Sequence, residues 1–146
     1  MDITGEHRIA APREAVWHAL FDVETLKACI PGCKELEQTS PTTFAAKVQL
    51  KIGPVSATFA GTVELHDIDA PNGCRIVGQG NGGIAGFAKG SSDMRLTVDG
   101  AGTLLTYDAK AEIGGKLAAL GSRLVQATSR KLAEQFFGAF AGRLAS

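Results

Sequence analysis

The sequence predicts an α+β fold in which a curled antiparallel sheet of six to seven strands wraps around a long C-terminal helix. Two patterns predict it: apolar and polar residues alternate through the middle of the chain, and apolar residues recur at steps of three and four over 116–144. With 146 residues and 45% hydrophobic content, the chain has the size of one compact domain, residues 1–146. We therefore expect one sheet face to be covered by helix.

The first elements are a strand over 3–10 and two short helices. Pro12 opens the first helix, because proline fits the first helical position, and Asp22 can cap the second, over 23–29. The second helix must stop before Pro31-Gly32, since the residue before a proline disfavours helical geometry.

Five strands follow from residue 43 onward. Within each strand, every second residue is apolar or small and is expected to face inward. The expected inward residues are Phe44, Ala46, Val48, Leu50 and Ile52; Val55, Ala57, Phe59, Gly61, Val63 and Leu65; Cys74, Ile76 and Gly78; Met94, Leu96 and Val98; and Leu105, Tyr107, Ala109, Ala111 and Ile113. Glycine and proline turns separate the strands, so their order predicts an antiparallel meander.

The closing segment predicts one uninterrupted helix over 116–144, roughly 43 Å long at the standard rise. Its apolar stripe comprises Leu117, Leu120, Leu124, Val125, Thr128, Leu132 and Phe136. The midline of the stripe is small, with Gly121, Thr128 and Ala139, which favours either close packing on the sheet or a space for a ligand. Phe137, Phe140 and Leu144 lie off the stripe and predict a partner contact, unless packing on the first strand absorbs them.

Composition excludes several classes of function. Fifteen basic residues balance fifteen acidic ones without a basic block, which argues against nucleic-acid binding. No apolar run is long enough to span a membrane and the start lacks a signal peptide, so we expect a cytoplasmic protein. Cys29, Cys33 and Cys74 are interpreted as free thiols, because the three histidines lack the spacing of metal ligands.

No catalytic constellation is visible among the inward residues. The glycine-rich run 78–83 precedes a strand and not a helix, which argues against a phosphate-binding loop. His7 and Tyr107 share inward phases and could orient an apolar guest, although core residues with satisfied hydrogen bonds are the more common case. The predicted ligand-binding residues are His7, Trp17, Phe44, Val48, Phe59, Val63, Ile76, Met94, Leu96, Tyr107, Leu120, Leu124 and Thr128. No bound cofactor or metal is expected.

Four segments carry a family resemblance. They are Ile30-Pro31-Gly32-Cys33 with Leu36-Glu37, Lys51-Ile52-Gly53-Pro54-Val55 with Phe59-Ala60-Gly61, Gly86-Phe87-Ala88-Lys89-Gly90, and Gly114-Gly115-Lys116-Leu117-Ala118 through Gly121-Ser122-Arg123. Together they resemble the CoxG family, named for the G subunit of carbon monoxide dehydrogenase, within the SRPBCC superfamily of START and birch-pollen-allergen proteins. That superfamily implies a helix-grip fold with an apolar ligand between sheet and helix.

The resemblance implies an accessory role beside a molybdenum hydroxylase of the carbon monoxide dehydrogenase type. The role would be maturation, membrane recruitment, or delivery of a quinone-like or lipid-like molecule. Longer relatives continue to an apolar anchor, whereas this sequence ends at Ser146, so we expect only transient contact with the inner face of the membrane, through Phe137 and Phe140. A homodimer through the same residues is a further interpretation.

Two other functions stay open. One is a protein-interaction adaptor with a filled core that works through Phe137, Phe140 and Leu144. The other is an enzyme related to cyclases or hydrolases, for which only His7 and Tyr107 offer ionisable groups. The identity of the ligand does not follow from the sequence.

Overall fold

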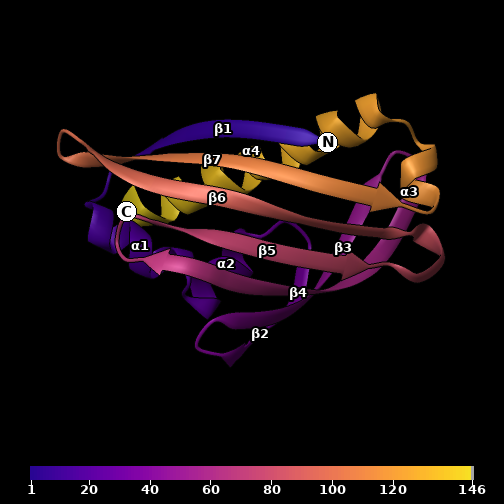
Figure 1. Cartoon of the computed structure of the whole chain (residues 1–146), viewed down its shortest axis with the longest axis horizontal. Helices are drawn as coiled ribbons and strands as arrows, with labels where there is room; N and C mark the ends of the chain where they lie inside the picture. The colour runs from indigo at the N-terminus through magenta and orange to yellow at the C-terminus, as the bar shows by residue number, and fades with distance from the viewer. Residues whose placement is uncertain (146) are drawn as a thin grey trace.

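A single sheet of seven antiparallel strands dominates the computed structural model, which describes residues 1–145 (Figure 1). The strands are β1 (Asp2–Ile9), β2 (Cys33–Ser40), β3 (Thr43–Ile52), β4 (Val55–Asp69), β5 (Gly73–Asn81), β6 (Phe87–Asp99) and β7 (Gly102–Gly114). Their order in the sheet is β1-β7-β6-β5-β4-β3-β2, so the first strand pairs with the last and the others form a meander. The long C-terminal helix crosses behind the sheet in Figure 1. This arrangement confirms the predicted helix-grip architecture.

The two short helices after β1 form where the sequence predicts them. They are α1 (Arg13–Leu20), preceded by Pro12, and α2 (Val23–Cys29). Asp22 caps α2: its carboxylate accepts hydrogen bonds from the Thr25 amide at 3.1 Å and the Thr25 hydroxyl at 2.7 Å. These two bonds lower the pKa of Asp22.

The predicted alternation holds along β3 and β4, where every second residue is shielded and the intervening residues are mostly exposed. We call the shielded side, which faces the C-terminal helix, the inner face. Two details differ from the prediction. Val98 is 66% exposed because it lies next to the β6–β7 turn. Strand β2 does not emerge from the pattern, since Leu36 is its one large apolar side chain and alternation needs several.

The C-terminal helix is not continuous, contrary to the prediction. A short helix, α3 (Lys116–Ala119), is followed by Leu120 and Gly121, and α4 (Ser122–Ala145) begins afterwards. Gly121 has φ +92°, a conformation that glycine adopts without strain and that ends a helix. Leu117 and Leu120 therefore do not lie on the same helix as the residues of α4, and including them rotates the predicted stripe away from the observed one. The stripe residues Val125 and Phe136 do face inward: Val125 is buried and Phe136 lines the space between α4 and the sheet.

The shifted stripe explains the errors along α4. Phe140, predicted to face a partner, is fully buried, and Phe137 and Leu144 are half-buried against the same core. Leu124, predicted to face inward, is 37% exposed, and the supposed midline residue Ala139 is exposed. The prediction of an outward apolar patch is therefore wrong at Phe140.

The core is concentrated at one end of the molecule. We call it the α1 end: it contains α1, the end of β1, the β6–β7 turn and the last turns of α4 (Figure 1). Its most deeply buried apolar side chains are Ile9, Val16, Leu96, Leu105 and Phe140. Thr103 is buried with them, and its hydroxyl donates to the Ala11 carbonyl oxygen at 2.8 Å. The opposite end, with the β3–β4 turn, the 3-10 helix η1 (Gly83–Ala85) and α3, we call the α3 end.

Candidate functional site

An apolar cavity lies between the inner face of the sheet and the helices. Its volume is ≈ 410 Å³. The sheet, both short helices and α4 all contribute to its wall, which consists of Leu20, Phe21, Leu26, Ile30, Leu36, Phe44, Ala46, Val63, Leu65, Ile76, Ser92, Met94, Leu105, Tyr107, Ala109, Ala133, Phe136 and Phe137. A space of this size is unusual in a close-packed interior, and it falls within the range of small-molecule sites.

Only two side chains in this wall, Ser92 and Tyr107, have polar groups. Ser92 on β6 pairs with Ala109 on β7, and Met94 pairs with Tyr107, so Ser92 and Tyr107 are diagonal neighbours on the inner face. Burial raises the pKa of Tyr107, with Arg130 opposing the shift and Glu134 adding to it. Tyr107 therefore keeps its proton at neutral pH and can donate a hydrogen bond.

The ring of Tyr107 lies across β1. A Cβ atom added to Gly5 would come within 2.6 Å of the Tyr107 hydroxyl oxygen, so the absence of a side chain at residue 5 makes room for the ring. In the pairing of β1 with β7, Gly5 stands directly opposite Tyr107. The position of the phenol is thus fixed by a glycine on the neighbouring strand.

His7 lies beside the cavity and joins an aromatic stack. Its ring stacks on Phe137 with centroids 4.2 Å apart, and Phe137 stacks on Tyr107 at 5.6 Å. Burial lowers the pKa of His7, and Glu134 on α4 partly opposes the shift. The neutral imidazole of His7 is therefore favoured. The aromatic stack connects β1, β7 and α4 next to the cavity wall.

The structure brings some of the predicted ligand-binding residues together and separates others. Phe44, Val63, Ile76, Met94 and Tyr107 line the cavity. His7 reaches it through Phe137, and Trp17 packs edge-on against the lining residue Phe21 with centroids 4.9 Å apart. Leu96 is buried in the core. The others, Val48, Phe59, Leu120, Leu124 and Thr128, do not line it.

The prediction missed the part of the wall that the short helices and β2 contribute. Leu26, Ile30 and Leu36 line the cavity, although no role was predicted for them. Leu26 is a large apolar residue within the predicted helix, and Ile30 directly follows that helix, which could have indicated that this segment packs on the sheet. Ser92 could have been found as the polar residue in the inward phase of Met94 and Leu96.

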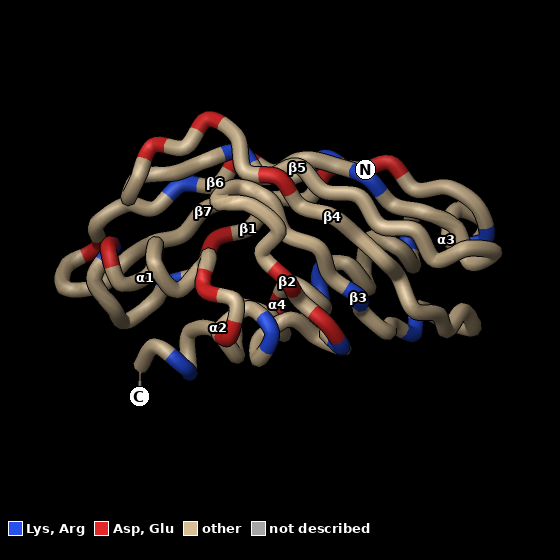
Figure 2. Tube along the Cα trace, turned by 90° about the horizontal axis from the view of Figure 1, so that it is seen from below, with Lys and Arg blue, Asp and Glu red and all other residues tan. Residues whose placement is uncertain are grey.

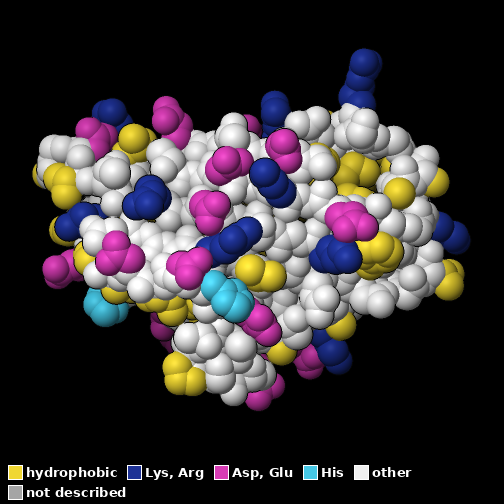
Figure 3. Space-filling model, viewed as in Figure 1, with side chains coloured by type: hydrophobic (Ala, Val, Ile, Leu, Met, Phe, Trp, Pro, Cys, Tyr) yellow, Lys and Arg dark blue, Asp and Glu magenta, His cyan; other side chains and the backbone are white. Residues whose placement is uncertain are grey.

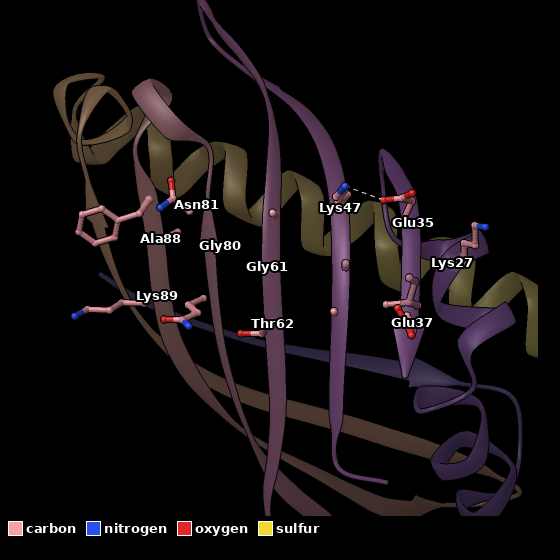
Figure 4. Close-up of a pocket in the computed structure, with 16 residues that line it drawn as sticks. Lys27, Glu35, Glu37, Lys47, Gly61, Thr62, Gly80, Asn81, Ala88 and Lys89 are labelled. Carbon is pink, nitrogen blue, oxygen red and sulfur yellow. Dashed lines mark ion pairs between the residues drawn. The ribbon is translucent and has the colours of Figure 1, made fainter. Parts of the chain in front are cut away.

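A larger hollow of ≈ 980 Å³ lies on the outer face of the sheet, across β2 to β6 (Figure 4). Figure 4 shows its side chains on the face that α4 does not cover. Lys47 and Glu35 form an ion pair at 3.3 Å there, with side chains 58% and 66% exposed. Charged side chains of both signs are spread over this face (Figure 3). The hollow is thus lined in part by charged and polar side chains, whereas the wall of the inner cavity is almost entirely apolar.

The three cysteines are free, with Cys29 and Cys74 buried and Cys33 half-buried. Burial raises the pKa of each thiol, and that of Cys74 to about 11. A thiol with a raised pKa is a poor nucleophile and a poor metal ligand at neutral pH. Among residues 1–145, no three His, Cys, Asp or Glu side chains lie close enough together to hold a metal ion.

Comparison with known families gives a match over residues 5–145, to the family described as the G subunit of carbon monoxide dehydrogenase (CoxG). The chain belongs to the CoxG family. The four segments that suggested the resemblance all lie within the matched range. No curated protein matches this CoxG-family chain significantly.

Several solved structures have the same fold as this chain. A conserved protein from Geobacillus kaustophilus is 32% identical with a TM-score of 0.93, over 99% of this chain and 95% of that one. The Zhui aromatase/cyclase from Streptomyces sp. R1128 is 14% identical with a TM-score of 0.69, over 99% and 93%. Ara h 8.0201 is 13% identical with a TM-score of 0.69, over 99% and 97%. The last two show that the CoxG-family chain shares the helix-grip fold of the birch-allergen-like superfamily. In residues 1–145, no helix is sufficiently long and apolar to span a bilayer.

Proposed function

We propose that this protein is a non-enzymatic binding protein that holds an apolar small molecule in the cavity between the sheet and α4. The observation that supports it most directly is the cavity itself, ≈ 410 Å³ with sixteen of eighteen lining residues apolar. Transfer of an apolar molecule from water into such a space is favoured in proportion to the area buried. Quinones and lipids are the ligand classes that fit this chemistry.

The polar groups of the wall support a ligand that accepts hydrogen bonds at one end. The Tyr107 hydroxyl is protonated at neutral pH, and the Ser92 hydroxyl lies diagonally across from it on the inner face. Both can donate to a carbonyl oxygen of a quinone ring or a lipid head. The apolar remainder of the ligand would lie against Phe44, Val63 and Ile76.

We propose further that the bound molecule serves a carbon monoxide dehydrogenase or related molybdenum hydroxylase, in maturation or in recruitment to the membrane. The description of the matching family supports this role. The adaptor alternative has less support, because an apolar cavity lies in the core and the side chain of Phe140 is buried. Nothing in the cavity wall favours an enzyme, since Tyr107 is its one ionisable group besides the adjacent His7.

The fluorescence of Trp17 provides the test. It is the one tryptophan of the chain, and it packs on the lining residue Phe21. Titration with a soluble short-chain quinone should quench it in a saturable way. Organic extraction of protein purified from its own host should release a matching apolar compound. If neither quinones nor fatty acids bind, and extraction releases nothing, the proposal is wrong.

Two alanines on α4 give a matched pair of variants. Ala133 lines the cavity, whereas Ala139 is exposed on the same helix. Ala133→Phe should fill part of the cavity and weaken quinone binding at least tenfold, while Ala139→Phe should leave binding unchanged. Equal binding by the two variants would place the ligand elsewhere.

A further inference from the structure

Charge is distributed unevenly between the two ends of the molecule. The α3 end is formed by segments 47–60, 78–91 and 110–125. These segments contain six Lys or Arg and one Asp or Glu, whereas the rest of the chain contains nine Lys or Arg and fourteen Asp or Glu. Figure 2 shows the result, with basic residues prevailing around α3 and acidic residues around α1 and α2. Asp2 also lies at the α3 end, next to the amino group of Met1. Glu35 lies there too, since it forms an ion pair with Lys47 at 3.3 Å. Even with Asp2 and Glu35 counted, six Lys or Arg face three acids at this end, in a chain with zero formal net charge.

The cations of the α3 end are available for a partner. Lys51, Lys116 and Arg123 are exposed, and none forms an ion pair with another residue of the described range 1–145. They come from three different elements: the end of β3, α3 and the first turn of α4. Glu112, the one acid in these segments, is already paired with Lys89 at 3.5 Å.

Large apolar side chains protrude among these cations. Ile84, in η1, is 83% exposed, Phe87 is 39% exposed and Leu124 is 37% exposed. Figure 3 shows apolar side chains gathered at this end, where α3 and the β5–β6 connection lie. Ile84 lies on the β5–β6 connection, whereas Phe87 begins β6 and Leu124 lies in the first turn of α4. Exposed apolar groups of this size are unfavourable in water unless something covers them.

Close contacts at two glycines hold these segments together as one surface. A Cβ added to Gly115 would lie 2.6 Å from the Cα of Gly86, so the β5–β6 connection with Ile84 packs directly on the start of α3. A Cβ added to Gly53 would lie 2.9 Å from a methyl group of Leu124, which places the β3–β4 turn against the start of α4. Ile84, Leu124 and the three unpaired cations therefore belong to one end of the protein.

We propose that the α3 end docks on the surface of an anionic lipid bilayer. Peripheral membrane binding combines apolar side chains that enter the headgroup region with Lys and Arg that meet anionic lipids. The α3 end supplies both, and it has the charge complementary to such a surface. A protein partner would need a surface of complementary shape, whereas a bilayer needs none. The acidic α1 end would face away from the membrane.

Docking of the α3 end would explain how the protein recruits its partner enzyme to the membrane. The biological purpose of docking rests on the proposed function, but the docking itself does not. Binding to vesicles can be measured without any cavity ligand. Vesicle binding and quinone binding can therefore fail independently of one another.

The test is co-sedimentation of the full chain with vesicles of phosphatidylcholine alone or mixed with phosphatidylglycerol. We expect binding to the mixed vesicles only. Raising salt from about 0.1 M to about 1 M, which shortens the Debye length from about 10 Å to about 3 Å, should weaken it. Lys51→Glu, Lys116→Glu and Arg123→Glu should each weaken it about fivefold or more, since a cation near an anionic leaflet contributes about 1 kcal/mol.

Matched variants distinguish the effect of where the cations lie from the effect of the net charge of the protein. A triple variant of Lys34→Glu, Arg75→Glu and Arg95→Glu changes the net charge as much as the triple variant of the α3 end, at exposed residues elsewhere. It should keep most of the binding. Ile84→Asp should abolish binding, whereas Val98→Asp, at the exposed β6–β7 turn, should not. Equal loss in both triple variants, equal binding to neutral vesicles, or no binding at all would overturn the proposal.

Discussion

The two ends of the sheet are stabilised in different ways. At the α1 end, large side chains fill the space between sheet and helices, and Phe140 and Val16 are fully buried. At the α3 end, the inner residues of β3 and β4 are only half-buried, and the segments meet through glycines whose backbones touch. The α1 end is therefore stabilised by the packing of large side chains. The α3 end is stabilised by close contacts that only glycine permits. The ligand cavity is lined by none of the α3-end segments 47–60, 78–91 and 110–125.

The largest expected effect is at the α1 end. Phe140→Ala removes a fully buried ring and should lower the free energy of unfolding by about 3–5 kcal/mol. Leu124→Ala, at the α3 end on the same helix, should cost much less because the side chain is 37% exposed. Urea denaturation measures both. Equal losses would show that the α3 end is as well packed as the α1 end.

At the α3 end, adding a methyl group to a glycine should lower the free energy of unfolding. Gly86 has φ +113°, and a Cβ there would lie 2.2 Å from the Gly114 carbonyl oxygen, so Gly86→Ala should cost about 2–4 kcal/mol. Gly83→Ala is the control: its φ is +66° but its Cβ would meet nothing within 4 Å, so only about 1–2 kcal/mol of backbone strain is expected. Thermal or urea denaturation measures the difference between the two variants. That difference combines the backbone contact with the greater strain of the Gly86 conformation, φ +113° and ψ −165°, which is essentially open to glycine alone.

A buried hydrogen bond at the α1 end can be compared with an exposed one. Thr103→Val keeps the shape of the side chain but leaves the Ala11 carbonyl oxygen without its donor, at a cost of about 1–3 kcal/mol. Thr97 donates to the Leu104 carbonyl oxygen at 3.4 Å on an exposed surface, where water can replace it. Thr97→Val should therefore leave the denaturation midpoint nearly unchanged.

The smallest effect is a pH dependence at the stack beside the cavity. Burial lowers the pKa of His7 below its ordinary value of 6.5, so the unfolded chain binds a proton more readily than the folded one. The contribution of His7 to stability is therefore complete above pH 6.5 and decreases as the pH falls toward the folded pKa. His7→Gln should flatten this part of the curve of melting temperature against pH. An unchanged slope would mean that other groups cause it.

Alternation and capping made most of the sheet and both short helices predictable. Phe44 and Val63 were placed correctly because strands of period two leave little choice of face. The break at Gly121 was not predictable from pattern, since a single glycine is tolerated within a helix as well as at its end. That one error reversed the roles of Phe140 and Leu124. The wall contributed by Leu26 and Ile30 depends on how α2 docks, which is a tertiary property.

The pairing of β1 with β7 has a consequence for synthesis of the protein. Asp2 pairs with Lys110 and Ile9 with Thr103, so about one hundred residues separate the two sides of this ladder. At about 5–20 residues per second, β1 waits roughly 5–20 seconds on the ribosome before its partner is made. During that time the apolar side chains of β1 have neither β7 nor α4 to cover them. This edge of the sheet can therefore close only when nearly the whole chain has been made, and Ile3 and Ile9 stay uncovered until then.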